Sequence, residues 1–398
     1  MTDKLVKLKK ELEKELANIL QYWMHHAVDE QCGGFYGKID NDNKVDINAP
    51  KGLVLNARIL WSFSAAYNHT KEKQYLVIAD RAWHFLMKHF LDKQYGGFYW
   101  SVDKDGNIPD SKKQIYGIAF CLYGFSEYYK ATRNSKVLQQ AKYCYHCIEQ
   151  YSFDKDKGGY LEAFTRTWEP IKDLRLSVKD ANEKKTMNTH LHVLEAYTNL
   201  YKVWKDEKLR NSIKLLLENF MDHIINDNTG HLQLFFDEDW QVKGDIVSYG
   251  HDIEAAWLLL EATETISDDV LMEKIKGMSV KMAVAAAKGL DIDGGLWYEV
   301  EHGKLVAQKH SWPQAEALVG FFNAWQLTAE KKYLQYALNN WQFIQQYMLD
   351  KENGEWFWGV NRDHTIMEGQ DKAGFWKCPY HNSRACMEII KRIPYQTN

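Results

Sequence analysis

The stretch LDKQYGGFYWSVDKDG, residues Leu91 to Gly106, has the pattern of a tight hairpin. Two glycines open it, an aromatic strand follows, and an Asp-Lys-Asp-Gly turn reverses the chain. Similar stretches occur five more times: VDEQCGGFYGKID (Val28–Asp40), FDKDKGGYLEAF (Phe153–Phe164), INDNTGHLQLFF (Ile225–Phe236), LDIDGGLWYEV (Leu290–Val300) and LDKENGEWFWGV (Leu349–Val360). The second turn glycine or its equivalent therefore returns every 59 to 71 residues, at Gly34, Gly97, Gly159, Gly230, Gly295 and Gly354. A period of this length accommodates two helices with their loops.

Each hairpin stands between two helical runs of different character. The runs before the hairpins, such as residues 7–26 and 75–91, are amphipathic, with charges between apolar residues at helical spacing. The runs after the hairpins, such as residues 115–129 and 251–263, carry few charges and many small or aromatic residues. A helix that is apolar on most of its faces is buried. We therefore predict six outer and six inner helices.

An alternating set of twelve helices could form an open solenoid or a closed ring. An open solenoid needs polar capping repeats at its ends, but the last inner run, residues 382–392, still has an apolar face. The first outer helix could cover that face by closing the ring. The sequence thus predicts an all-α protein, an (α/α)6 barrel of six inner and six outer helices with short β-hairpins at one rim. The absence of a linker or low-complexity segment predicts one catalytic domain over residues 1–398.

The composition of the chain excludes several classes of partner. The 398 residues carry a net charge of -4 with mixed signs, so no basic block indicates nucleic acid. The N-terminus is charged and helical, and no run of about 18 apolar residues indicates a membrane span. We expect a cytoplasmic monomer with reduced thiols. The Cys144–Cys147 pair lies within an amphipathic run, which favours packing over a metal or redox site.

Polar residues gather where the inner helices begin, at what should be one rim of the ring. Buried without a purpose, such side chains would be costly. In chain order they are Arg58, Tyr116, Asn188, His190, His192, His251, Glu254, Trp312, Glu316, Trp376 and His381.

Several of these residues also have structural interpretations. Arg58 could pair with Glu254 or Glu316 as a buried ion. His251 and Glu254 share a helix face, which could be half of a metal site, although the glutamate orienting the imidazole is the preferred interpretation. His190 and His192 diverge by roughly 200° around a helix, which disfavours joint metal ligation. No complete ligand set occurs at metal spacing, so we expect no metal.

Histidines, an arginine and aromatic walls suit proton transfer next to a sugar carbonyl. Histidine takes and returns protons near neutral pH. An arginine can stabilise the oxygen charge of an enediolate. Inversion at the carbon requires an acid on the face opposite the base, and a second histidine on another helix can provide it.

The segments NTHLHVLEAYT, SYGHDIEAAWLL, QAEALVGF and WKCPYHNSRACMEI resemble the N-acylglucosamine 2-epimerase superfamily, and within it the cellobiose 2-epimerases. The resemblance covers the whole chain. It implies an (α/α)6 barrel and reversible C2 epimerisation of the reducing-end glucose of β-1,4-linked disaccharides, such as cellobiose to glucosyl-mannose or lactose to epilactose. It implies no cofactor or metal.

The resemblance also implies roles for individual residues. His251 and His381 match the acid/base pair, His192 a third essential histidine, and Arg58 the arginine that stabilises the enediolate. The residues expected to hold the sugar or orient a histidine are Tyr116, Asn188, Glu254, Trp312 and Trp376, with Asp180 lining the cleft. This chain has Ser311-Trp312 where the cellobiose epimerase pattern has Trp-Trp.

Other activities are compatible with parts of this pattern. A mannose 2-epimerase, an N-acylglucosamine 2-epimerase or a mannose-type aldose–ketose isomerase would use the same histidines. A glycoside hydrolase would need two carboxylates flanking the bond, for which Glu254 and Glu316 are candidates, but would leave the histidines without a role. A sugar-binding protein would need the aromatic residues alone.

Overall fold

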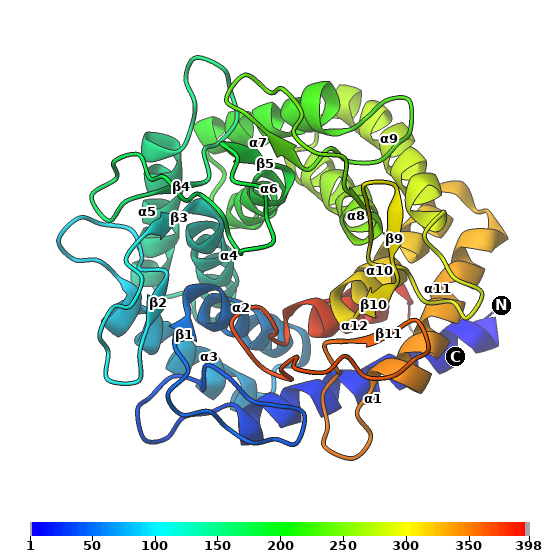
Figure 1. Cartoon of the computed structure of the whole chain (residues 1–398), viewed down its shortest axis with the longest axis horizontal. Helices are drawn as coiled ribbons and strands as arrows, with labels where there is room; N and C mark the ends of the chain where they lie inside the picture. Colours follow the sequence, from blue (N-terminus) through cyan, green and yellow to red (C-terminus); the bar gives the residue numbers. More distant parts are fainter. Residues whose placement is uncertain (1, 395–398) are drawn as a thin grey trace.

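The computed structural model describes residues 2–394, which form twelve α-helices in two concentric rings (Figure 1). The outer ring consists of α1 (Thr2–His26), α3 (Lys73–Phe85), α5 (Ser135–Tyr151), α7 (Glu207–Asn219), α9 (Asp269–Ala287) and α11 (Lys331–Phe343). The inner ring consists of α2 (Leu53–Thr70), α4 (Ile115–Thr132), α6 (Met187–Tyr201), α8 (Tyr249–Ile266), α10 (Ser311–Thr328) and α12 (Tyr380–Arg392). The predicted (α/α)6 barrel is confirmed.

The two rings differ in burial as their sequences predict. In α2 every residue from Leu53 to Ala66 is buried. In the outer helix α3 the buried residues are confined to one face: Tyr75, Ala79, Ala82, Trp83 and Phe85. Three outer helices continue into a π-helical turn before their hairpins: η1 (Leu86–Phe90), η2 (Phe220–Ile224) and η3 (Ile344–Met348).

The hairpins join neighbouring repeats at one rim of the barrel. The strands are β1 (Lys51–Gly52), β2 (Ser101–Val102), β3 (Lys113–Gln114), β4 (Ala163–Phe164), β5 (Lys185–Thr186), β6 (Phe235–Phe236), β7 (Val247–Ser248), β8 (Glu299–Glu301), β9 (Lys304–Val306), β10 (Gln308–His310) and β11 (Gly359–Asn361). The strand before each inner helix pairs antiparallel with the hairpin of the next repeat, as β1 does with β2 and β7 with β8. A bridge between Ile39 and Ala373 joins the last repeat to the first and closes this chain of pairings.

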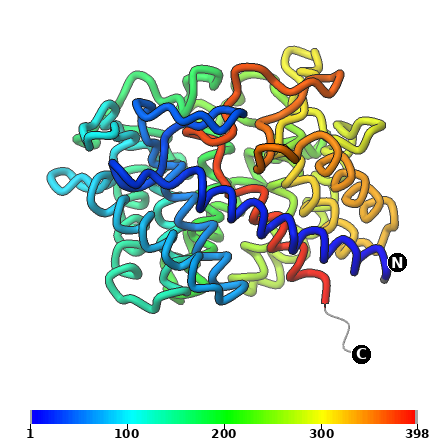
Figure 2. The backbone as a smooth tube through the Cα atoms, turned by 90° about the horizontal axis from the view of Figure 1, so that it is seen from below, coloured from blue at the N-terminus to red at the C-terminus, as the bar shows by residue number. Residues whose placement is uncertain are grey.

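The first outer helix closes the helical ring. Helix α1 packs against α12, so the N-terminal and C-terminal helices lie side by side (Figure 2). The Lys9 ammonium donates a hydrogen bond of 2.7 Å to the Ile393 carbonyl at the end of α12. The apolar face of the last inner helix is thereby covered, as the closed ring requires.

The glycine pair of the hairpins is required by backbone conformation and by close packing. Gly97 has a φ of 68°, a left-handed conformation that side chains with a Cβ rarely adopt. A Cβ at this position would lie 2.7 Å from the Trp168 ring of the next hairpin. Glycine is therefore the residue that permits both the turn and the contact.

Buried ion pairs fix the hairpins to the inner helices, and sequence reasoning missed them. In five of the six repeats an acidic hairpin residue pairs with a buried lysine that precedes the inner helix. The pairs are Lys51–Asp29 (2.6 Å), Lys113–Asp92 (2.9 Å), Lys185–Asp154 (2.9 Å), Lys309–Asp291 (2.7 Å) and Lys377–Glu355 (2.8 Å). In the fourth repeat both partners are replaced, by Asn226 and Val247. The recurring acid and lysine were the signal available in the sequence.

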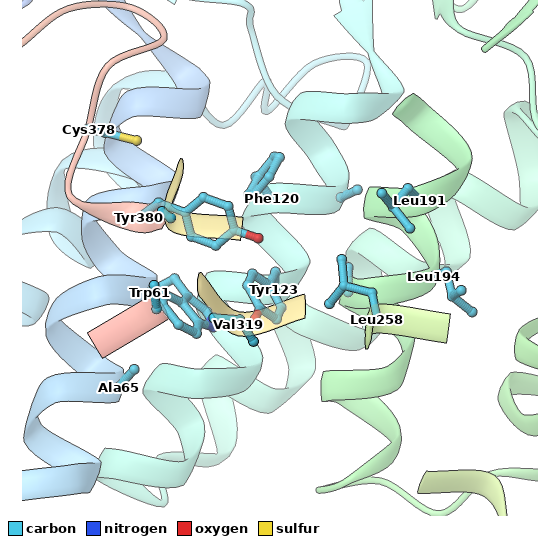
Figure 3. Close-up of a cluster of buried hydrophobic side chains, with 14 of the residues drawn as sticks. Trp61, Ala65, Phe120, Tyr123, Leu191, Leu194, Leu258, Val319, Cys378 and Tyr380 are labelled. Carbon is cyan, nitrogen blue, oxygen red and sulfur yellow. The ribbon is translucent and has the colours of Figure 1, made fainter. Parts of the chain in front are cut away.

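Apolar side chains from the inner helices fill the barrel axis below the hairpin rim (Figure 3). Trp61 of α2 stacks on Tyr123 of α4 with ring centroids 5.0 Å apart, and Tyr380 of α12 contacts both rings edge-on. The axis of the barrel is thus a packed core below the hairpin rim. Across residues 2–394, no helix is long and apolar enough to cross a membrane.

Candidate active site

A cavity of about 840 Å³ opens at the hairpin rim, above the packed axis of the barrel. The ten residues that the sequence predicts for the site all line it: Arg58, Tyr116, Asn188, His192, His251, Glu254, Trp312, Trp376, His381 and Asp180. They come from all six repeats, so the ring closure itself assembles the site.

Because the six repeats are built alike, residues at equivalent positions of the inner helices lie side by side around the barrel axis. Seven residues after the buried lysine of each repeat, or after Val247 in the fourth, every inner helix directs one side chain toward the barrel axis. These six residues are Arg58, Phe120, His192, Glu254, Glu316 and Arg384. All six are buried. His251 and His381 each stand three residues earlier in their helices, in the fourth and sixth repeats.

Four histidines line the cavity; the fourth, His310, contacts Gln308 Oε1 through Nε2 at 3.0 Å. The other three, His192, His251 and His381, are the cavity histidines discussed below, and each is held through Nδ1. His381 contacts Glu316 Oε1 at 2.7 Å, and His192 contacts Glu195 Oε2 at 3.0 Å. His251 contacts the Ser248 hydroxyl at 2.8 Å. Among the described residues none forms a hydrogen bond with Nε2 of these histidines, and that nitrogen is therefore left for a ligand in the cavity.

A buried arginine, Arg384, ties together the carboxylates below the cavity. Its Nη2 donates to Glu254 Oε1 at 2.8 Å and to Glu316 Oε1 at 2.6 Å, and its Nη1 donates to Glu195. The guanidinium also lies over the rings of Trp257 and Tyr380. Arg384 thus supports the carboxylates that hold two of the histidines.

The charges of this cluster set its pKa values. Burial alone would raise the pKa of Glu195, but the Arg384 guanidinium lowers it to about 2. Burial, together with the neighbouring Glu316 charge, raises the pKa of Glu254 to about 8. One arginine is shared by three carboxyl groups, so the least stabilised of them retains a proton near neutral pH.

Burial keeps the cavity histidines neutral. It lowers the pKa of His251 to about 3. It also takes the pKa of His381 well below the usual range, and the positive charges of Arg58 and Arg384 act in the same direction. A neutral imidazole with Nδ1 occupied by a hydrogen bond offers its other nitrogen for proton transfer.

Arg58 lies on the opposite side of the cavity floor and has no carboxylate partner within residues 2–394. Its Nη2 donates to the Tyr116 hydroxyl at 2.7 Å, and its guanidinium lies 4.1 Å from the centre of the Phe120 ring. The Nε group of Arg58 is buried without a hydrogen-bond partner. The expected pairing of Arg58 with Glu254 or Glu316 is wrong, because Arg384 occupies both carboxylates.

One expectation about side chains is corrected, and one rival interpretation lacks the geometry that it needs. Glu254 shares a helix face with His251 but bonds to Arg384, so it does not orient that imidazole, and Ser248 does. The candidate hydrolase pair, Glu254 and Glu316, converges on a single guanidinium nitrogen instead of flanking a space for a glycosidic bond.

His190 differs from the cavity histidines because both of its nitrogens are occupied by the backbone. Nδ1 donates to the Thr186 carbonyl at 2.6 Å, and Nε2 accepts the Tyr160 N–H at 2.9 Å. It is fully buried and fixes the third hairpin to α6.

Sequence reasoning did not identify Arg384, Glu195 or Tyr380. The Tyr380 hydroxyl donates to Glu195 at 2.5 Å, which places this tyrosine in the same network. The signal for Arg384 was its place in the sixth inner helix, equivalent to that of Arg58, His192 and Glu254.

Aromatic rings and a loop form the upper wall of the cavity. The Trp312 ring contacts two histidines, with its centroid 4.6 Å from that of His251 and 5.7 Å from that of His381. Trp376 packs beside Trp100 and Tyr116. Asp180 accepts the Ser177 N–H at 2.8 Å, and burial raises its pKa.

Neutral histidines and an arginine around an aromatic-walled cavity, at one end of a closed (α/α)6 barrel, are groups that can transfer protons. The chain belongs to the N-acylglucosamine 2-epimerase family, whose model matches residues 34–385.

Two curated relatives and one solved structure show how near the likeness is. Cellobiose 2-epimerase of Bacteroides fragilis is 48% identical over 386 residues, covering 96% of this chain and 98% of that relative. Cellobiose 2-epimerase of Dictyoglomus turgidum is 40% identical, covering 97% and 99%. The structure of cellobiose 2-epimerase from Bacillus thermoamylovorans superposes with a TM-score of 0.93 at 41% identity, covering 98% of this chain and 100% of that one.

Proposed function

We propose that the protein catalyses reversible epimerisation at C2 of the reducing-end glucose of β-1,4-linked disaccharides. Cellobiose would become glucosyl-mannose, and lactose would become epilactose. The observation that carries this proposal is the pair His251 and His381, whose rings both contact Trp312 and whose Nε2 atoms have no hydrogen-bond partner within the described residues. The full-length similarity to cellobiose 2-epimerases supports the choice of disaccharides.

The proposed reaction proceeds by proton transfer through an enediolate. One of the two histidines removes the C2 proton with Nε2, and the other delivers a proton to the opposite face of the carbon. Arg58 stabilises the negative charge that develops on the enediolate oxygen. His192 assists ring opening or holds the open-chain sugar.

The remaining residues would bind the sugar. Trp312 and Trp376 offer apolar ring faces on which a pyranose can stack. Tyr116, Asn188 and Asp180 offer hydrogen bonds, and the Asn188 side-chain oxygen is buried without a partner within the described residues. Glu254 completes the floor beneath them.

The test is incubation with cellobiose, lactose, mannose and N-acetylglucosamine in heavy water, followed by proton NMR of the separated products. We expect a mannose-type epimer of the disaccharides with deuterium at C2, because the delivered proton comes from an exchangeable imidazole. Free glucose would instead indicate hydrolysis, and full retention of protium at C2 would contradict the two-histidine scheme. A ketose as the main product would indicate the isomerase, which returns the proton to C1.

A further inference from the structure

The three cavity histidines are not supported in the same way. His381 and His192 contact carboxylates directly, and both of those carboxylates are buried and bound to Arg384. His251 instead contacts a hydroxyl, that of Ser248, which is itself buried at 1% exposure. A hydroxyl can donate or accept a hydrogen bond, so this contact is compatible with either tautomer of His251.

Behind Ser248 stands a further carboxyl group. Strands β7 and β8 pair antiparallel, and Ser248 lies directly opposite Glu299 in their register. Side chains directly opposite in such a pair lie on the same face of the sheet. The Ser248 hydroxyl also lies near enough to the Glu299 carboxyl group to favour its charged form. His251 thus contacts Ser248, and Ser248 has Glu299 as its neighbour across the strand pair.

Glu299 differs from the carboxylates behind the other histidines in its access to solvent. It is half-buried and lines the open part of the cavity, whereas Glu316 and Glu195 are 1% and 3% exposed. Burial raises the pKa of Glu299 to about 7; the nearby Tyr298 and Ser248 hydroxyls oppose this shift, and the charges of Glu301 and Asp180 add to it. A group of this pKa can both take and release a proton near neutral pH.

We propose that Ser248 and Glu299 form a proton relay behind His251, which lets this histidine exchange protons with the substrate while remaining neutral. The proposal rests on the proposed epimerase function. As Nε2 takes the proton from the sugar carbon, Nδ1 passes its own proton to the Ser248 oxygen, and the Ser248 hydroxyl proton moves to the Glu299 carboxylate. The negative charge moves from Glu299 to the enediolate, and all three transfers reverse when His251 acts as the acid.

The relay resolves a conflict in the energetics of His251. Burial makes the imidazolium of this residue costly, as its lowered pKa shows. A histidine that gains a proton on one nitrogen and loses one from the other avoids that charge. Ser248 and Glu299 act through His251 and are positioning residues in this scheme.

The experiment compares Glu299→Ala, Ser248→Ala and Ser248→Thr with the wild type on cellobiose, with Glu238→Gln as an exposed hairpin control. Loss of a hydrogen bond to a charged group predicts that kcat falls by about 10- to 100-fold in the two alanine variants. Ser248→Thr keeps the hydroxyl and should retain most of kcat. Added formate or acetate should restore Glu299→Ala in proportion to its concentration, but not Ser248→Ala, in which the link to His251 is missing.

Thermal melts establish that each variant is folded, so that kcat reports on the relay. A Glu299→Ala enzyme with normal kcat, or a kcat that formate and acetate leave unchanged at constant ionic strength, would overturn the relay. The wild-type heavy-water assay is read separately. If the wild type forms no epimer, the proposed function fails and the relay with it, whereas an active wild type with an unaffected Glu299→Ala variant refutes the relay alone.

Discussion

His251 and His381 occupy the same position in two inner helices, but different partners hold their imidazoles. Both stand three residues before the residue that their helix directs toward the barrel axis. His381 Nδ1 contacts the Glu316 carboxylate, whereas His251 Nδ1 contacts the Ser248 hydroxyl. The repeat therefore determines where a side chain lies, and the hydrogen-bond partner determines what chemistry it can perform.

The charged groups around the two histidines differ as well. Two guanidinium groups, those of Arg58 and Arg384, add to burial in lowering the pKa of His381. For His251 the main cause is burial, followed by the neighbouring His192. His381 thus belongs to a network of fixed charges, while His251 lies against a neutral group that can reverse its hydrogen bond.

Replacing each histidine in turn tests most directly whether His251 and His381 act as a catalytic pair. His251→Asn and His381→Asn should each lower kcat/KM by about 10²- to 10⁴-fold, because each removes a positioned acid or base. Steady-state kinetics with cellobiose measures the loss. His146→Asn, an exposed position on α5, is the matched control and should keep normal activity. Near-normal turnover in either folded cavity variant would show that the two positions are not a catalytic pair.

Removing Arg384 tests the network that supports His381 and His192 but not His251. In Arg384→Met, three buried carboxyl groups lose their shared counter-charge, and loss of one partner from a buried ion cluster costs about 3–5 kcal/mol. Urea denaturation at neutral pH should show this loss of unfolding free energy. Adding Glu254→Gln to the variant should recover part of it, because one of the unpaired carboxyl groups is then gone. Wild-type stability in Arg384→Met would mean that the cluster is not held by the guanidinium.

The sequence predicted the fold because the signals for it are local and repeated. The glycine hairpins mark the rim, and the low charge of runs such as residues 115–129 marks the inner helices. Ring closure followed from the apolar face of the last helix, which α1 covers in the structure. Each of these inferences needed only the spacing of residue types along one segment.

Side-chain partners could not be predicted in the same way. His251 and Glu254 are three residues apart and share a helix face, yet Arg384, 130 residues further along the chain, binds the glutamate. Ser248 meets Glu299 only because β7 pairs with β8 of the next repeat. Such contacts depend on how repeats are placed around the ring, and spacing within one helix does not specify them.

A smaller effect is expected when Glu316, the hydrogen-bond partner of His381, is replaced. This substitution tests how much the charge of that partner contributes to the difference between His381 and His251. In Glu316→Gln the contact to Nδ1 can remain but its charge is lost, and hydrogen bonds to charged groups contribute about 1.5–3 kcal/mol. A fall in kcat of roughly 10- to 150-fold should follow, with KM little changed. Glu149→Gln removes a carboxylate bound by Tyr160 and Tyr197 away from the cavity and serves as the control. Equal losses in both variants would point to a general effect on packing.

The smallest expected effect is that of a chelator, which should leave activity unchanged. Glu254, Glu316 and His381 present ligand atoms that all lie within 4.8 Å of one another, the one such group among residues 2–394. These three could hold a cation by distance alone. The Arg384 guanidinium, however, already donates to the Oε1 atoms of both glutamates, at 2.8 and 2.6 Å. A divalent ion would have to displace this buried positive charge or lie against it. We therefore expect equal rates of cellobiose epimerisation before and after prolonged dialysis against EDTA. Activity that is lost in EDTA and restored by a divalent ion would make His381 a ligand and end its equivalence with His251.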